Sequence, residues 1–227
     1  MRIAGFQKLT LVDYPGLVAA TVFTQGCNFR CGYCHNPQLV LPEHYQEPMP
    51  SEQVLDFLNG RRGKLDGVVI TGGEPTIQQG LAEFIARIKE MGFAVKLDTN
   101  GSNPQILSSL LASKFLDYIA MDIKSSLLKY SEVTGTACDI ERIKESIGII
   151  INSGISYQFR TTLVKGHCSN EDLSDIQFLI RHGTHYVLQP LVLSEKMVDP
   201  HFSRHNQFSI QEVDILKSKY EKTKPLA

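Results

Sequence analysis

The sequence predicts an α/β protein built on a parallel β-sheet. Six short apolar runs alternate along its 227 residues with longer segments in which apolar residues recur at helical spacing. Short runs that are almost wholly apolar are typical of parallel strands buried on both faces, and their alternation with helices favours βαβ units. The periodicity leaves two architectures open, a doubly wound open sheet and a barrel or partial barrel.

The predicted elements follow one another with no Pro-rich or Ser-rich linker. Strands are predicted over residues 17–23, 67–71, 94–98, 118–122, 157–164 and 186–190. Helices are predicted over residues 51–59, 79–91, 140–152, 170–181 and 209–220, and one more begins at Pro104. Ser51 is expected to cap the first helix and Gly60 to end it. We predict one domain, residues 1–227, with an N-terminal extension over 1–16 and a C-terminal loop and helix over 191–227.

The composition is that of an ordinary globular protein, with 42% hydrophobic and 21% charged residues and a net charge of −1. A basic tail or lysine run is absent, which argues against nucleic acid as a partner. The first ten residues lack a signal-peptide pattern, and apolar runs fall short of the ~18 residues of a membrane span. We expect a soluble cytoplasmic protein with no membrane partner, in which clustered cysteines stay reduced.

Polar clusters stand at or near the ends of the predicted strands. Functional residues of parallel α/β folds gather where the strands end. In chain order the clusters are residues 27–34, residues 72–75, residues 98–100, residues 122–124, Arg160 and Gln189. We therefore expect them to converge on one ligand.

Three of the five cysteines, Cys27, Cys31 and Cys34, fall within eight positions. Three thiolates can each bind one iron of a [4Fe–4S] cluster, which leaves the fourth iron open to an outside ligand. Three other interpretations compete: a zinc site completed by His35, haem attachment at residues 31–35, and redox cysteines without metal. Neighbouring residues of an extended chain point apart, which disfavours zinc, and haem attachment would need export. The cysteines alone leave the question open.

The cluster at residues 72–75 contains two glycines and a carboxylate. Gly72 and Gly73 would let the backbone approach a ligand closely. Glu74 could accept a charge-assisted hydrogen bond from an ammonium group. A strand-ending turn closed by Pro75 is the alternative.

Two other clusters pair residues that lie two positions apart. Asp98 and Asn100 would face the same side of an extended segment and could hold ribose hydroxyls, although an Asn-Gly pair also favours a plain turn. Asp122 and Lys124 have the same spacing, and the alternative for them is a surface ion pair.

The last two positions lie in the fifth and sixth predicted strands. Arg160 occupies an apolar strand, and arginine is rarely buried without a partner. That partner is either a ligand carboxylate or a core ion pair with Asp122 or Glu74. Gln189 could face the ligand or a partner protein.

The Cys-x₃-Cys-x₂-Cys spacing, with Tyr33 before the last cysteine, resembles the signature of the radical S-adenosylmethionine (SAM) superfamily. The Gly-Gly-Glu-Pro segment 72–75 is similar to the motif with which that superfamily holds the methionyl amine of SAM. The resemblance covers nearly the whole chain. It implies a partial (β/α)₆ TIM-like barrel, with a [4Fe–4S] cluster on Cys27, Cys31 and Cys34.

The resemblance also implies where SAM binds. The residues implied are Tyr33, Gly72, Gly73, Glu74, Asp98, Asn100, Asp122, Lys124, Arg160 and Gln189. Two carboxylates close to the SAM carboxylate would repel it unless they are neutralised. A small cation site at Asp98, Thr99 and Asp122 could neutralise them, and so could Lys124.

Three segments resemble a narrower group, the activating proteins of anaerobic ribonucleoside-triphosphate reductase. The activating enzymes of pyruvate formate-lyase are close relatives of that group. The three segments are Leu-Val-Asp-Tyr-Pro-Gly at 11–16, Phe-Thr-Gln-Gly-Cys-Asn-Phe at 23–29 and Cys-His-Asn-Pro at 34–37. The resemblance implies an anaerobic oxidoreductase that cleaves SAM reductively and makes a glycyl radical on that partner. A one-electron donor such as flavodoxin or ferredoxin would supply the electron. The loop 192–206 could contact the partner or be a solvated linker.

Two alternatives stay open. The first is a radical SAM enzyme that acts on a small molecule, such as a 7-carboxy-7-deazaguanine synthase-like enzyme. Lys124, Lys165 and Arg160 could supply the basic residues that such a substrate needs. The second is a zinc-binding interaction protein without catalytic activity.

Overall fold

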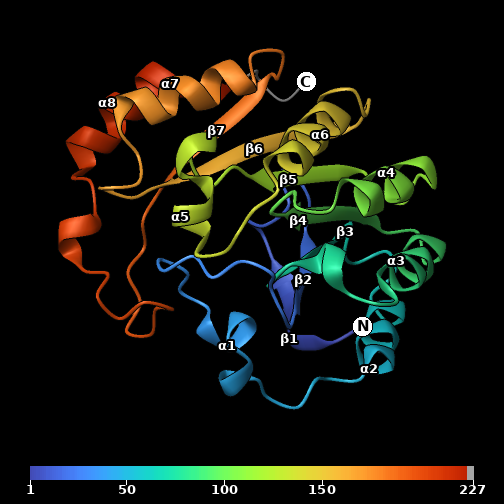
Figure 1. The fold of residues 1–227 in the computed structure, drawn as a ribbon. Helices are drawn as coiled ribbons and strands as arrows, with labels where there is room; N and C mark the ends of the chain where they lie inside the picture. The colour runs from blue at the N-terminus through green and yellow to red at the C-terminus, as the bar shows by residue number, and fades with distance from the viewer. Residues whose placement is uncertain (224–227) are drawn as a thin grey trace.

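The computed structural model describes residues 1–223 and contains one eight-stranded sheet in the order β1 to β8 (Figure 1). Six parallel strands form its centre: β2 (Ala19–Thr24), β3 (Gly67–Gly72), β4 (Ala94–Thr99), β5 (Tyr118–Asp122), β6 (Ser156–Leu163) and β7 (His185–Pro190). Each lies within two residues of its predicted bounds. The prediction of an α/β fold with a parallel sheet is confirmed. The last part of the predicted C-terminal loop and helix, 191–227, lies outside the described residues.

The two edges of the sheet carry antiparallel strands, β1 (Ile3–Thr10) beside β2 and β8 (Lys222–Thr223) beside β7. The sheet therefore curves without closing on itself, as a partial barrel does. The predicted N-terminal extension is the edge strand β1 and the turn after it, so it belongs to the same sheet.

Helices cover the outer side of this sheet (Figure 1). The six predicted ones are α2 (Ser51–Asn59), α3 (Leu81–Glu90), α4 (Pro104–Ala112), α6 (Ile140–Ile151), α7 (Asn170–Leu179) and α8 (Ile210–Tyr220). Shorter turns were not predicted, because three to five residues show no periodicity: α1 (Pro37–Val40), α5 (Tyr130–Thr134), η1 (Pro42–His44), η2 (Pro75–Ile77), η3 (Leu127–Lys129) and η4 (Arg204–Asn206). Among the described helices, none is both long and apolar enough to cross a bilayer.

The prediction that Ser51 caps α2 is wrong. Pro50 occupies the cap position in an extended conformation, and Ser51 is the first helical residue without a capping side-chain bond. A side chain that is already inside the helix cannot reach the free amides of the first turn as a capping residue does. Gly60 ends the helix as predicted.

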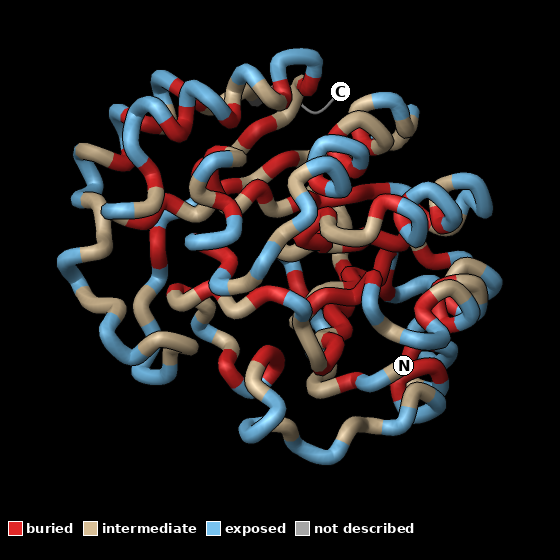
Figure 2. Tube along the Cα trace, in the orientation of Figure 1, coloured by how far each residue is buried: buried red, intermediate tan, exposed pale blue. Residues whose placement is uncertain are grey.

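The core has two parts, and Figure 2 shows the buried residues following the strands and the inner helix faces. The larger part lies between the sheet and the helices. The smaller part fills the floor of the barrel and consists of Tyr14, Ala19, Val69, Tyr118 and Ala120. The barrel interior is therefore closed by side chains at the amino ends of its strands.

Tyr14 forms much of this floor. It is 4% exposed, and its ring packs edge-on against Tyr118 with centroids 5.9 Å apart. A Cβ on Gly67 would lie 2.7 Å from the Tyr14 ring, so glycine leaves the room that the ring occupies. Beside it, the Asp13 carboxylate accepts a hydrogen bond of 2.7 Å from the Thr21 hydroxyl. The segment 11–16 thus acts as a structural plug.

Replacing Tyr14 by alanine should lower the free energy of unfolding by about 3–5 kcal/mol, because a large aromatic-to-alanine change leaves a cavity in the core. The control Tyr14→Phe keeps the ring and should lose much less. Urea unfolding measures both. Equal stability of the two variants would contradict the role of the ring as a plug.

Candidate active site

The mouth of the barrel contains a cavity of about 560 Å³ at the carboxyl ends of the parallel strands. All thirteen predicted site residues line it: Cys27, Cys31, Tyr33, Cys34, Gly72, Gly73, Glu74, Asp98, Asn100, Asp122, Lys124, Arg160 and Gln189. They come from the ends of β2 to β7, so the sheet brings together residues that lie far apart in the sequence. The volume lies within the roughly 300–1,000 Å³ that is usual for ligand sites.

The three cysteines lie on the loop between β2 and α1. Burial raises the pKa of the Cys27 thiol to about 12. Burial also raises the pKa of Cys31, while the nearby Lys124 acts in the opposite direction. Buried thiols of this kind become thiolates only beside a strong positive charge, such as bound metal. The Arg30 guanidinium holds the loop by donating to the Cys27 carbonyl at 2.6 Å.

His35, the proposed fourth ligand of a zinc site, also lines the cavity. Burial lowers its pKa, which favours the neutral ring. Within the described part of the chain, no three His, Cys, Asp or Glu side chains are grouped as they would be around one metal ion, which disfavours a zinc site. A cluster does not need that grouping, because each of its thiolates binds a different iron.

Glu74 is completely buried and joins the ends of β3 and β4. Its Oε1 accepts hydrogen bonds from the Thr76 amide and hydroxyl, at 3.0 and 2.5 Å, and from the Thr99 hydroxyl at 2.7 Å. Its Oε2 accepts one bond of 2.6 Å, from the Asn100 amide. A carboxylate oxygen has about two lone-pair positions, so Oε2 retains a position for one more donor.

The two glycines before Glu74 let β3 pack closely against neighbouring backbone. A Cβ on Gly72 would collide with the Thr24 backbone, and a Cβ on Gly73 would collide with the Gly26 carbonyl. The Gly73 amide donates to the Thr24 carbonyl at 2.9 Å. Their missing side chains therefore let β3 end against the backbone of the cysteine loop. Both glycines also line the cavity, and their close approach to a ligand stays a prediction.

Five charged side chains form a chain of alternating sign, and all of them except Lys96 line the cavity. Lys96 pairs with Asp98 Oδ1. Arg160 then bridges Asp98 Oδ2 at 3.1 Å and Asp122 Oδ1 at 2.7 Å. Lys124 completes the chain with Asp122 Oδ2 at 3.0 Å. Three cations and two anions leave this charged chain with one excess positive charge.

Every member of this charged chain has an ion-pair partner within the protein. Arg160 forms a core ion pair with Asp122, as one of the two expectations had it, and also pairs with Asp98. Burial would raise the pKa of Asp122, but Arg160 and Lys124 hold it well below its usual range. Burial lowers the pKa of Lys96, and Asp98 opposes this effect. The two carboxylates are thus neutralised by the protein's own cations; an added cation at Asp98, Thr99 and Asp122 stays a prediction.

Two residues of this region were not predicted. Lys96 stands two positions before Asp98 in a strand, the same spacing as Asp122 and Lys124, so its signal was present in the sequence. Asn28 accepts a bond of 2.9 Å from the Asn100 side chain and thereby ties the cysteine loop to the end of β4. Only its position beside Cys27 could have indicated it.

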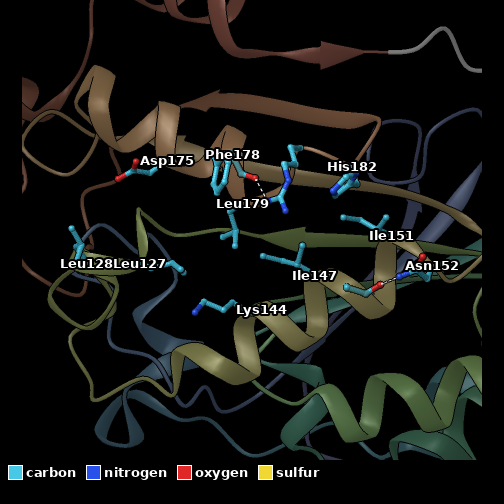
Figure 3. A pocket seen from close by; sticks show the side chains of 12 residues that line it. Leu127, Leu128, Lys144, Ile147, Ile151, Asn152, Asp175, Phe178, Leu179 and His182 are labelled. Atoms are coloured by element: carbon cyan, nitrogen blue, oxygen red, sulfur yellow. Dashed lines mark hydrogen bonds between the residues drawn. The ribbon is translucent and has the colours of Figure 1, made fainter.

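A second and larger hollow, of about 780 Å³, lies outside the barrel between α6 and α7 (Figure 3). Its lining is largely apolar and includes Leu127, Ile147, Ile151, Phe178 and Leu179. It shares no residue with the cavity that holds the cysteines. We therefore assign the chemistry to the barrel mouth.

Comparison with known proteins identifies the family. The family model for the radical SAM superfamily matches residues 21–179, more than half of the chain. The protein belongs to the radical SAM superfamily. This radical SAM protein is 37% identical over 195 residues to a protein of Methanocaldococcus jannaschii named provisionally as a glycyl-radical enzyme activating enzyme, covering 82% of this chain and 78% of the relative.

Two further similarities help to place this radical SAM protein. A protein of Thermococcus kodakarensis, named provisionally as a GTP 3′,8-cyclase, is 28% identical over 193 residues, which cover 84% of this chain and 62% of the relative. The structure of SuiB from Streptococcus suis with bound S-adenosylmethionine superposes with a TM-score of 0.69 at 15% identity, over 86% of this chain and 44% of SuiB. At that identity the likeness shows the fold alone.

The superfamily implies a [4Fe–4S] cluster and SAM, and the residues of this radical SAM protein fit both. Three thiols on one loop face a single cavity, and a donor set of three cysteines suits a cluster with one open iron. The cavity continues from them past Glu74 to Gln189. Glu74, whose Oε2 accepts only one hydrogen bond within the protein, would hold the methionyl ammonium. The excess positive charge of the charged chain suits the methionyl carboxylate.

Replacing Cys27, Cys31 or Cys34 by alanine should each abolish most iron binding, because each thiolate holds one iron of the cluster. Iron and sulfide are measured after anaerobic reconstitution. Cys138→Ala and Cys168→Ala are matched controls that should keep full iron. Cluster loss in a control, or full iron in Cys31→Ala, would refute the ligand assignment.

Asn100→Ala and Gln189→Ala should each weaken SAM binding about two- to tenfold, since a neutral hydrogen bond contributes roughly 0.5–1.5 kcal/mol. Titration of SAM into the cluster-loaded protein measures the dissociation constant. Asn152→Ala, on the outer groove of Figure 3, is the matched control and should bind SAM as the unmodified protein does. Unchanged affinity in both test variants would remove SAM from this part of the cavity.

Proposed function

We propose that this radical SAM enzyme generates a glycyl radical on a partner enzyme, and that the partner is an anaerobic ribonucleoside-triphosphate reductase. The observation that carries the proposal is the 37% identity, over 82% of the chain, to a relative named as an activating enzyme of glycyl-radical enzymes. The segments 11–16, 23–29 and 34–37 favour the reductase among possible partners. Flavodoxin or ferredoxin is the proposed electron donor.

In this proposal the residues of the cavity have different roles, which depend on where they lie. Cys27, Cys31 and Cys34 hold the cluster, and cluster and SAM together supply the one-electron cleavage that yields the hydrogen-abstracting radical. Glu74 orients the methionyl ammonium through Oε2. Lys124, at the end of the charged chain, faces the methionyl carboxylate.

Exposed apolar side chains around the cavity mouth support a protein substrate. Ile77 follows β3 and Val192 follows β7, and they are 42% and 65% exposed. Val192 also lines the cavity itself. A partner protein seated on the rim could bury these side chains and gain apolar contact area.

A second candidate is a small purine substrate. It is favoured by the similarity to the relative named as a GTP 3′,8-cyclase, and by the cations Lys124 and Arg160 in the cavity. These cations are already paired with carboxylates in the protein, which weakens this candidate.

Mixing the reduced, cluster-loaded enzyme with SAM and an anaerobic ribonucleotide reductase, without oxygen, should produce a glycyl doublet in the electron spin resonance spectrum of the reductase. A reductase whose radical glycine is replaced by alanine is the control and should give no doublet. SAM cleavage without a partner radical, accompanied by turnover of GTP or another purine precursor, would favour the second candidate instead.

A further inference from the structure

The segment that follows β7 crosses the cysteine loop. We call residues 191–206 the strap. The Val198 amide donates to the Cys34 carbonyl at 2.9 Å, and the Asp199 amide donates to the Gly32 carbonyl at 2.9 Å. Figure 1 shows this orange-red segment descending beside the blue loop near α1. The loop 192–206, expected either to contact a partner or to be a solvated linker, is thus bonded directly to the backbone between two cysteines.

Phe202 of the strap packs into the cysteine loop. Its ring lies edge-on to Tyr33 and to His167, with centroids 6.2 and 5.7 Å apart. Tyr33 and His167 also contact each other edge-on at 6.1 Å. Three rings in mutual edge-to-face contact make a compact cluster, and each such pair adds stability beyond the area it buries.

Gly32 is the point at which the strap and the loop approach most closely. A Cβ on Gly32 would lie 2.7 Å from Phe202 Cε2 and 3.1 Å from Asp199 Cβ. Gly32 does not adopt the left-handed backbone conformation, so its own backbone geometry does not demand glycine. The requirement for a missing side chain at position 32 therefore comes from the strap, about 170 residues later in the sequence.

The strap is also anchored where it begins and ends. The Gln207 side chain donates to the Leu191 carbonyl at 2.8 Å, which closes the base of the strap. The Lys165 amide donates to the Asn206 carbonyl at 2.8 Å. With both ends fixed to the barrel, the position of Phe202 is determined by the fold and not only by its contact with the loop.

We propose that Phe202 and Gly32 form a lock that fixes the turn from Cys31 to Cys34 in the shape that binds the cluster. Gly32 and Tyr33 are the two residues between these cysteines, and the Cys34 amide donates to the Cys31 carbonyl at 3.0 Å. A shift of the turn changes the directions of both thiols together. Phe202 is thus a positioning residue that acts through the turn. The lock rests on the assignment of the cluster to these cysteines and not on the identity of the partner.

Iron release to an iron(II) chelator under anaerobic conditions tests the lock. Gly32→Ala, which forces a methyl group against Phe202, should release iron roughly tenfold faster than the unmodified protein. Phe202→Ala should also accelerate release. The double variant should release iron more slowly than Gly32→Ala alone, because truncating Phe202 makes room for the new methyl group. Phe208→Ala, outside the strap, is the matched control and should leave the rate unchanged.

A second measurement needs no metal. Trypsin can cut the strap after Lys196 or Arg204, and the apo-protein should be cut there several times faster in Gly32→Ala and Phe202→Ala than in Phe208→Ala. This readout reports strap detachment, which a general loss of iron affinity would not change.

Two results would overturn the lock. One is a Phe202→Ala protein that holds iron, and resists trypsin at the strap, as well as the Phe208→Ala control does. The other is a double variant that loses iron as fast as Gly32→Ala alone. If Gly32→Ala does not fold, the comparison of Phe202→Ala with Phe208→Ala still decides. A reductase that gains no radical while these results hold would refute the proposed partner and leave the lock intact.

Discussion

The buried carboxylate of Glu74 is the interaction on which the shape of the barrel mouth depends. It accepts four hydrogen bonds from Thr76, Thr99 and Asn100, which lie at or just after the ends of two different strands. The Asn100 side chain in turn donates a hydrogen bond to Asn28, the residue after the first cysteine. A buried carboxylate is costly unless it is well bonded, so the same bonds that stabilise Glu74 hold the cysteine loop, the end of β3 and the end of β4 in one arrangement.

The charged chain extends this arrangement across the other side of the cavity. Removing one member of a buried ion pair leaves an uncompensated charge, which costs far more than a surface pair contributes. Asp98 and Asp122 are each held from two sides, with Arg160 between them. Their directions are therefore set before a ligand arrives. Such preorganisation lowers the cost of binding a charged molecule, because little rearrangement of the site remains to be made.

The sequence predicted the location of the site better than its internal bonding. Strand ends in a parallel sheet share one edge, so apolar runs followed by polar clusters were enough to place Glu74 and the cysteines in one cavity. The partners of Glu74 could not be predicted, because its bond to the Asn100 amide depends on how two loops meet. Lys96 could have been predicted, because it stands two positions before Asp98 in the same strand. The contact between Gly32 and Phe202 has no local pattern, since it joins distant segments.

The plug formed by Tyr14 gives the barrel a closed floor, so the interior has the shape of a cup. Solvent and small molecules then reach its contents through the rim, past side chains such as Val192. A protein that settles on that rim would cover the opening with its own surface. Such a partner would keep water away from a reactive radical at that opening.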